Sequence, residues 1–172
     1  MKIRNNFIDT VLVLNKFNID YWVDFGTLLG IHRDHDIILG DNDADICVPI
    51  SEEANLRNAL QNSNLRWEYV NEGELYRVYS KLIIGADIFV DLYLIKYEGD
   101  LVNIPYAPLT PIEYLKEIEE SEVQIDLKKI KIKQPVRWRD LLEWRYGKRW
   151  TEKVKKWWLG YLTFEDVKNP LN

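Results

Sequence analysis

Two aspartates, Asp43 and Asp45, lie two residues apart where a polar loop gives way to the apolar run Ile46-Cys47-Val48. Side chains alternate along a strand, so a strand over residues 44–48 points both carboxylates the same way, with Cα atoms about 7 Å apart. Carboxylates this close repel each other unless a cation lies between them, and Mg²⁺ is usually held by one or two carboxylates together with phosphate oxygens. Ordinary turns and solvated strand ends also carry this pattern, so a structural role is the alternative.

A third acid, Asp91, is embedded in the apolar segment 89–95, where a lone ionised group is costly without a partner. A metal ion shared with Asp43 and Asp45 is one such partner, and an ion pair with a nearby Lys or Arg is the alternative. Asp87 has the same strand parity and is a substitute for Asp91 in this argument. We favour Asp91 because apolar residues flank it on both sides.

Upstream of these acids, the segment Gly26-Thr27-Leu28-Leu29-Gly30 has the character of a strand-to-helix turn. A glycine without Cβ, a hydroxyl group and the free amides of a helix start can together bind a phosphate. Gly-Thr pairs also open many helices that bind nothing. The motif gains weight because only a short polar loop separates it from Asp43 and Asp45.

The periodicity of apolar residues and the turn formers predict the order of helices and strands. We expect helices over residues 3–17, 26–33, 51–62 and 137–146, and a further helix starting at Pro111 because Thr110 and Glu113 have the positions of a capping box. Strands are expected over residues 21–24, 44–48, 65–70, 76–84 and 88–95 and around Ile130 and Ile132, with a hairpin between the third and fourth. This order predicts an α+β or α/β domain with a mixed β-sheet flanked by helices.

Composition restricts the setting and the partners. At 172 residues the chain suits one compact domain, which we expect to span residues 1–172. A net charge of −5 makes long nucleic acids unexpected partners. In the basic, Trp-rich segment 128–156, Lys and Arg would suit an anionic donor, an anionic acceptor or a peripheral contact with lipid headgroups, and a solvated helix face is the alternative.

The single cysteine, Cys47, excludes an intramolecular disulfide, and the two histidines do not suffice for a Cys/His zinc cluster. No apolar run approaches the roughly 20 residues of a transmembrane helix, and charged residues interrupt the N-terminus before a signal-like core develops. We therefore expect a cytoplasmic protein. The oligomeric state is not indicated by the sequence.

The stretch from Tyr21 to Arg33 and the stretch from Gly40 to Ile46 closely resemble the LicD and fukutin group of the nucleotidyltransferase superfamily. That group has an aromatic strand, G-T-L-L-G, an arginine, a short loop and a run of acids ending in D-x-D. Residues 90–93 resemble its later strand with the third acid, and residues 130–150 resemble its closing pattern. Phe25 stands where the pattern has a small residue. The resemblance implies the nucleotidyltransferase fold, with a catalytic core over about residues 18–96 and a short helical C-terminal extension over about residues 105–172.

The resemblance also implies roles for individual residues. Asp43, Asp45 and Asp91 would bind Mg²⁺ or Mn²⁺, with Asp91 also able to assist deprotonation of the attacking hydroxyl. Gly26 and Thr27 would bind the donor phosphate, and Asp41 would support the metal ligands. Arg33 would suit a two-point phosphate contact, with a helix-surface ion pair as the alternative.

The implied reaction is a two-metal, in-line displacement that moves a phospho-headgroup, such as phosphocholine or a polyol phosphate, from a CDP-linked donor to a glycan hydroxyl. The same carboxylates are equally suited to moving a nucleoside monophosphate from a triphosphate to a small molecule or an RNA end. A non-catalytic module that binds a nucleotide or glycan is the rival from another class. Three intact acids argue against that rival, because a binding module does not need all of them.

Overall fold

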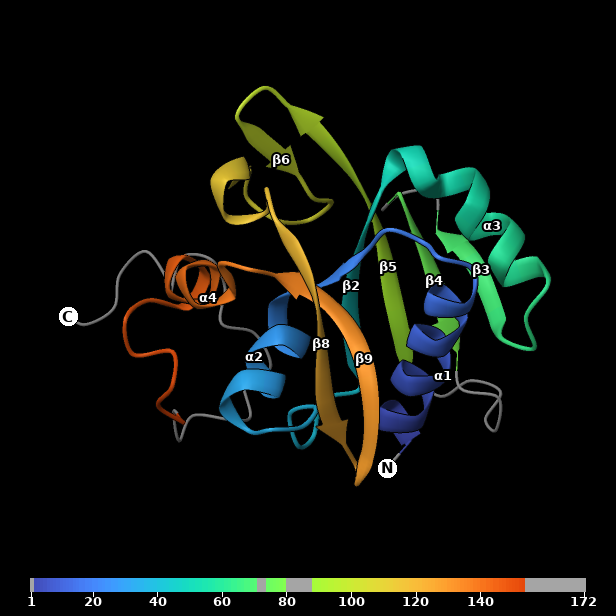
Figure 1. Ribbon diagram of the computed structural model, residues 1–172, viewed down its shortest axis with the longest axis horizontal. Helices are drawn as coiled ribbons and strands as arrows, with labels where there is room; N and C mark the ends of the chain where they lie inside the picture. Colours follow the sequence, from blue (N-terminus) through green and yellow to red (C-terminus); the bar gives the residue numbers. More distant parts are fainter. Residues whose placement is uncertain (1, 71–73, 80–87, 154–172) are drawn as a thin grey trace.

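The computed structural model describes residues 2–70, 74–79 and 88–153 (Figure 1). A mixed sheet forms its centre, with strands in the order β1-β2-β5-β4-β3. These strands are β1 (Trp22–Val23), β2 (Asp43–Pro49), β5 (Phe89–Glu98), β4 (Leu75–Tyr79) and β3 (Arg66–Val70). β2 and β5 are parallel, and the other neighbours in this order are antiparallel. The predicted fold class, a mixed sheet flanked by helices, is confirmed.

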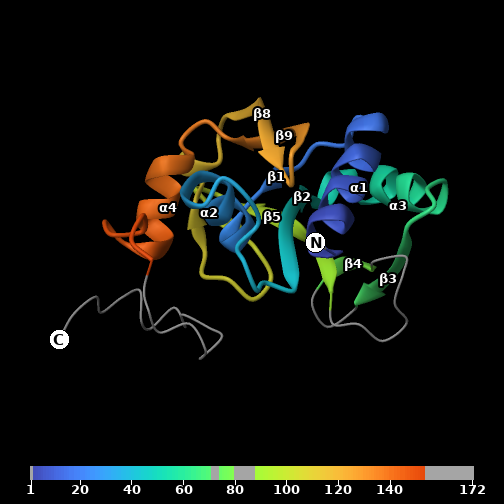
Figure 2. The ribbon, with the colours of Figure 1, turned by 90° about the horizontal axis from the view of Figure 1, so that it is seen from below.

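One face of the sheet is apolar and covered by helices. Ala44 and Ile46 of β2 and Val90 and Leu92 of β5 are fully buried on this face. Helices α1 (Lys2–Lys16) and α3 (Glu53–Gln61) lie side by side over it (Figure 2). The apolar residues of α1 recur at helical spacing, so the helix buries one stripe against the strands and keeps its polar side in water.

The opposite face carries the acids and has a different cover. Helix α2 (Phe25–Arg33) starts beside β2, and α4 (Trp138–Tyr146) packs against α2 (Figure 1). Gly147 follows α4 with a φ of +79°, a backbone conformation that only glycine adopts without strain, and its N–H bonds the carbonyl of Glu143 at 2.8 Å. The predicted end of this helix at Gly147 is therefore confirmed.

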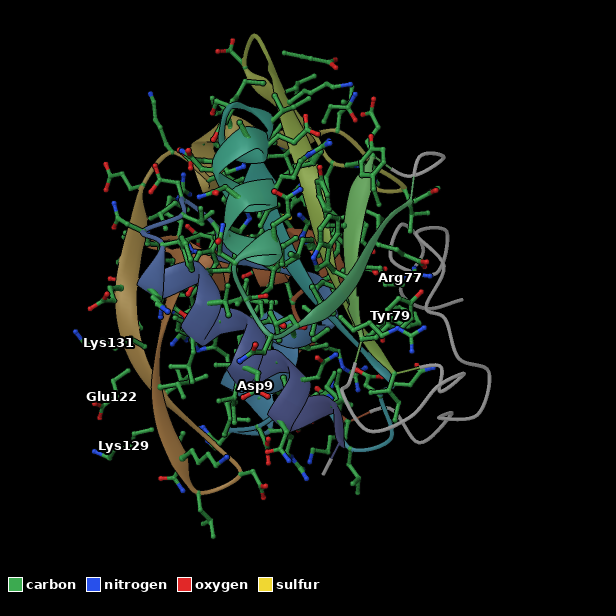
Figure 3. All side chains as sticks on the ribbon, turned by 90° about the vertical axis from the view of Figure 1, so that its right-hand side faces the viewer. Asp9, Arg77, Tyr79, Glu122, Lys129 and Lys131 are labelled. Carbon is green, nitrogen blue, oxygen red and sulfur yellow. The ribbon has the colours of Figure 1, made fainter. Side chains whose placement is uncertain are left out.

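A separate hairpin of β8 (Ile118–Ile125) and β9 (Lys128–Pro135) packs across β1 and α1. Its inner face contributes Ile125, Ile130 and Ile132 to the core. On its outer face, Lys129 pairs with Glu122 at 2.9 Å and Lys131 with Glu120 at 2.7 Å (Figure 3). The strand predicted around Ile130 is confirmed, whereas β8 was not predicted because its residues are mostly polar.

The helix predicted from Pro111 is wrong. Thr110–Pro111 forms a short strand, β7, that pairs with β6 (Leu101–Asn103), and only one 3₁₀ turn, η3 (Ile112–Tyr114), follows it. The backbone N–H of Ile112 bonds the carbonyl of Asp100 at 2.9 Å, so tertiary pairing overrides the local capping signal.

The other predicted helices and strands are confirmed within the described residues. The C-terminal extension is not purely helical as predicted, because its described part contains β7, β8 and β9 as well as α4. The helix predicted from Ser51 has a first turn of 3₁₀ type, η1 (Ile50–Glu52), before α3. β3 and β4 pair antiparallel, as the hairpin prediction requires. Residues 80–84 of the predicted fourth strand, and Asp87, lie outside the described residues. No described helix combines the length and apolar character needed to span a membrane.

Candidate active site

The structure brings the three predicted acids to one face of two adjacent strands. Asp45 of β2 lies directly opposite Asp91 of β5, and Asp43 lies opposite Phe89. Because β2 and β5 are parallel neighbours, paired residues point to the same face about 5 Å apart. Asp43 and Asp45 are partly exposed on this face, whereas the intervening Ala44 is fully buried on the other. The common orientation of Asp43 and Asp45 that alternation predicted is thus observed, and the strand register adds Asp91 beside them.

These carboxylates repel one another. Burial and then the charge of Asp91 raise the pKa of Asp43, and burial followed by the charges of Asp43 and Asp91 raises the pKa of Asp45. Burial and the charge of Asp43 raise the pKa of Asp41 to about 6. The Tyr93 hydroxyl lies 3.4 Å from Oδ1 of Asp45, and burial followed by the charge of Asp45 raises the pKa of Tyr93. This end of the sheet is therefore a concentration of negative charge that favours a cation.

Asp91 also has an ion-pair partner, the alternative that the sequence left open. Arg77 of β4 donates from Nε to Oδ1 of Asp91 at 2.7 Å and from Nη2 to Oδ2 at 2.9 Å. Among the described residues, no three Asp, Glu, His or Cys side chains already surround a common point as a closed metal cage does. Asp43 and Asp45 face the site, whereas both oxygens of Asp91 are shared with Arg77.

The donor set fits a hard divalent cation. Mg²⁺ favours oxygen ligands and is commonly bound through one or two carboxylates plus substrate phosphates, which matches Asp43 and Asp45 in number and chemistry. Gly26 leaves room beside them: a Cβ there would lie 3.5 Å from Oδ2 of Asp41 and 3.9 Å from Oδ2 of Asp45. A missing side chain at this position leaves space between the turn and the acids where a phosphate group could approach.

The turn at the start of α2 is tied directly to the strand with the acids. The Thr27 hydroxyl accepts a hydrogen bond from the backbone N–H of Asp45 at 2.7 Å, and Thr27 is buried. Asp24 caps the helix by accepting from the N–H of Phe25 at 2.7 Å. The first amides of a helix lack carbonyl partners within it, so this turn presents donors beside Asp45. Thr27 thus has a structural contact in addition to its predicted phosphate role.

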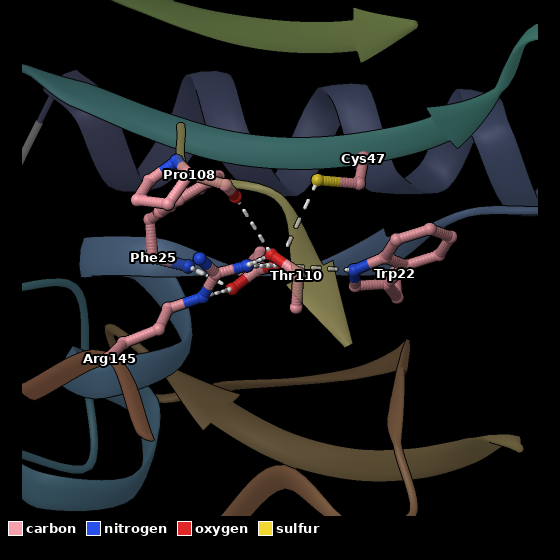
Figure 4. A network of polar contacts seen from close by, with 7 residues as sticks. Trp22, Phe25, Cys47, Pro108, Thr110 and Arg145 are labelled. Atoms are coloured by element: carbon pink, nitrogen blue, oxygen red, sulfur yellow. Dashed lines mark hydrogen bonds and ion pairs between the residues drawn. The ribbon is translucent and has the colours of Figure 1, made fainter. Parts of the chain in front are cut away.

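Behind this turn lies a buried ion pair that sequence reasoning missed. Arg145 of α4 donates to both oxygens of Asp24, at 2.8 and 2.7 Å, and both side chains are essentially inaccessible (Figure 4). Its guanidinium stacks on Phe25 at 4.2 Å from the ring centroid. Phe25 has a φ of +48°, a backbone conformation that is uncommon for a bulky side chain. The C-terminal helix therefore fixes the start of α2.

Arg33 and the second glycine of the motif border the loop before the acids. Arg33 donates to Asp34 at 3.1 and 2.9 Å, the ion pair that was the alternative to a phosphate contact. Lys153 also pairs with Asp34, at 2.9 Å, and the hydrogen bond from Arg33 lowers the pKa of Asp34. A Cβ on Gly30 would lie 2.7 Å from the carbonyl of Asp36, so glycine is required for this loop to approach α2.

Most basic residues in the described part of the basic, Trp-rich segment have acidic partners. These pairs join Lys129, Lys131, Lys133, Arg137, Arg145, Arg149 and Lys153 to neighbouring acids. Cross-strand and helix-surface pairing accounts for much of the charge run, and the part beyond residue 153 lies outside the described residues.

Two arginines that pair with acids around the site, Arg77 and Arg145, were not singled out from the sequence. Arg77 interrupts an apolar strand, as Asp91 does, and two opposite charges in two apolar strands are a usable signal for a cross-strand pair. Arg145 gave no such signal, because it stands among many other basic residues. Its pairing with Asp24 spans 121 positions of the sequence.

The fold and the site define the class. The solution structure of the antibiotic-resistance factor ANT(2″)-Ia is similar to this chain with a TM-score of 0.52 and 14% identity, covering 83% of this chain and 69% of that chain. The fold it shares is the nucleotidyltransferase fold, and the acids lie on its sheet beside a helix start. The protein thus has the nucleotidyltransferase fold.

The family model described as LicD/FKTN/FKRP, nucleotidyltransferase domain, matches residues 18–106, and the chain belongs to this family. An uncharacterized protein of Rickettsia prowazekii (strain Madrid E) is 35% identical over 82 residues, which are 48% of this chain and 30% of the relative. One of Rickettsia typhi (strain ATCC VR-144 / Wilmington) is 30% identical over 99 residues, 57% of this chain and 30% of the relative. Each match thus spans less than a third of the curated relative.

Proposed function

We propose that this domain transfers a phospho-headgroup, such as phosphocholine or a polyol phosphate, from a CDP-linked donor to a glycan hydroxyl and releases CMP. The observation that carries the proposal is the placement of Asp43, Asp45 and Asp91 on one face of adjacent parallel strands, beside the first turn of α2. Membership of the LicD/FKTN/FKRP family favours this reaction among those that such a site can perform.

In this proposal, Asp43 and Asp45 hold Mg²⁺ or Mn²⁺, with Asp91 as the third acid. The bound ion would neutralise charge on the donor phosphates and lower the pKa of the attacking hydroxyl. The backbone N–H groups of Gly26 and Thr27 would donate hydrogen bonds to phosphate oxygens, and the missing side chain of Gly26 lets the phosphate approach. Asp91 lies opposite Asp45, and in this proposal it would accept the hydroxyl proton with an oxygen that Arg77 releases. Arg33 can add a phosphate contact if it exchanges Asp34 for the donor.

The setting that we propose follows from the same residues. Cys47 is a free, buried thiol, in keeping with a reducing compartment such as the cytoplasm. A membrane or polymer contact through the basic, Trp-rich segment remains part of the proposal for the acceptor side. Long nucleic acids are disfavoured by the net charge of −5.

Donor profiling tests the proposal. The purified protein would be incubated with CDP-choline, CDP-ribitol, CTP or ATP, each with Mn²⁺ or Mg²⁺ and a panel of glycan acceptors, and the released nucleotide identified by chromatography. We expect CMP from a CDP-linked donor, dependent on acceptor and metal, and none from the Asp45→Asn variant. Release of pyrophosphate from CTP or ATP would show that the reaction is nucleotidyl transfer and would overturn the proposal. Metal-dependent nucleotide binding without turnover would favour a binding module.

A further inference from the structure

Arg77 belongs to a row of charged side chains that runs across neighbouring strands of the sheet. Asp45 of β2 is opposite Asp91 of β5, and Asp91 is opposite Arg77 of β4. All three therefore point to the same face of the sheet. Figure 3 shows Arg77 and Tyr79 on the side of the sheet away from α1. The guanidinium is thus part of the face that carries the candidate active site.

In the Asp91–Arg77 pair, the carboxylate is buried and held by two hydrogen bonds, whereas the guanidinium is partly exposed to solvent. The two hydrogen bonds, at 2.7 and 2.9 Å, engage both carboxylate oxygens. The side chain of Asp91 is only 6% exposed, whereas that of Arg77 is 27% exposed. A two-point pair of this kind is directional and strong, and the exposed part of the guanidinium can meet a ligand.

Neighbouring aromatic residues fix the guanidinium in this position. The Arg77 guanidinium lies 3.9 Å from the centroid of the Phe89 ring, and Tyr79 meets the same ring edge-on. Glu68 of β3 is opposite Arg77, but the Tyr79 hydroxyl bonds its carboxylate. Asp91 is therefore the carboxylate that Arg77 engages with both hydrogen bonds.

The other arginines near the acids are directed elsewhere. Arg145 pairs with Asp24 behind α2, and Arg33 pairs with Asp34 in the loop. The positive charge of Arg77 also lowers the pKa of Asp43, against the larger effects of burial and Asp91 that raise it. Among the described residues, Arg77 is thus the cation that pairs with one of the three site acids.

We propose that Arg77 is a positioning residue that holds Asp91, competes with a divalent cation for that carboxylate, and thereby couples metal binding to the arrival of a donor phosphate. A guanidinium and a divalent cation at the same carboxylate repel each other. A phosphate relieves that repulsion because it offers the guanidinium an alternative two-point partner. The proposal rests on the proposed function, since it assumes that the acids bind a metal and that the donor carries phosphate.

Binding of Mn²⁺, measured by electron paramagnetic resonance of the free ion, tests this coupling with and without CDP-choline. In Arg77→Met, we expect Mn²⁺ to bind about tenfold more tightly without the nucleotide, because the positive charge that competes for Asp91 is removed. We expect the nucleotide to increase Mn²⁺ affinity less in Arg77→Met than in the wild type. Arg77→Lys should lie between the two, because a lysine keeps the charge and loses the two-point geometry.

Arg66→Met is the matched control. Arg66 stacks on Tyr79 of the same face at 5.9 Å and has no acidic partner among the described residues, so its Mn²⁺ binding should equal that of the wild type. Unchanged or weaker Mn²⁺ binding in Arg77→Met, with a native circular dichroism spectrum, would overturn the proposal, as would absence of Mn²⁺ binding in every variant. Tighter Mn²⁺ binding without transfer from any donor would support the coupling and reject only the proposed reaction.

Discussion

The carboxylate–guanidinium pairs Asp24–Arg145 and Asp91–Arg77 have the same two-point chemistry but different surroundings. Asp24–Arg145 is sealed between α2 and α4, with side chains 0% and 1% exposed. Asp91–Arg77 lies on the open face of the sheet, among acids that repel one another. A fully buried pair cannot reach ligands and contributes to stability. A pair whose guanidinium is exposed beside several carboxylates can form a new ion pair with a ligand. The surroundings, rather than the pair itself, separate the structural region from the functional one.

The sealed pair gives the largest expected effect. Arg145→Met removes the cation and leaves Asp24 buried without its ionic partner, which typically costs about 3–5 kcal/mol in the free energy of unfolding. Urea unfolding followed by circular dichroism measures it. Arg137→Met, at the N-cap of the same helix, is the control, because its pair with Asp140 is exposed and should change stability by less than about 1 kcal/mol. Equal stability of the two variants would mean that Arg145 does not hold the structure together.

Substitution of the site acids should have the opposite result, with activity lost and stability kept. Asp45→Asn should reduce transfer by at least about a hundredfold, because a metal ligand is lost while the side-chain volume is kept. Its unfolding free energy should not fall. Burial and neighbouring charges raise the folded-state pKa of Asp45, so ionisation opposes folding, and removing it should stabilise the protein near pH 7 and not near pH 4.

Transfer assays and urea unfolding at both pH values test this prediction. Asp9→Asn, a change of an exposed acid on α1, serves as the control and should alter neither quantity. A loss of stability in Asp45→Asn that matches its loss of activity would assign Asp45 to the structural region and remove the contrast between the two pairs.

Local sequence signals were sufficient where a feature depends on alternation or on a nearby turn. The parity of Asp43 and Asp45, the end of α4 at Gly147 and the apolar stripe of α1 are features of this kind. Local signals fail where contacts with residues distant in the sequence determine the local structure. Thr110 and Pro111 carry a capping signal, yet pairing with β6 makes them a strand, and polar β8 exists because β9 neutralises its glutamates. The partner of Asp91 required the register of β4 on β5, which no local pattern encodes.

The smallest expected effect belongs to the interface of α2 and α4 that surrounds the sealed pair. His32 stacks on Trp138 with ring centroids 3.5 Å apart, and its Nε2 lies 2.8 Å from Oε1 of Gln134. Burial lowers the pKa of His32 below 6.5, an effect to which the charges of Arg139 and His35 add, while Gln134 and Glu119 oppose it. The unfolded chain therefore binds this proton more readily than the folded protein does. The contribution to stability is complete above pH 6.5 and is lost as the pH falls.

Between pH 7.5 and pH 5.5, protonation of His32 should lower the free energy of unfolding by up to about 1 kcal/mol. The raised pKa values of Asp41, Asp43 and Asp45 act with the opposite sign, because those groups stabilise the folded state as the pH falls. The difference between wild type and His32→Gln isolates the histidine, since the acids contribute equally to both. His35→Gln changes an exposed ring and should retain most of the wild-type pH dependence, because burial lowers the pKa of His32 more than the charge of His35 does. If His32→Gln also retains the wild-type pH dependence, burial at the interface of α2 and α4 does not disfavour protonation of His32. Asp24 and Arg145 would then be the only evidence that this interface is closed to solvent.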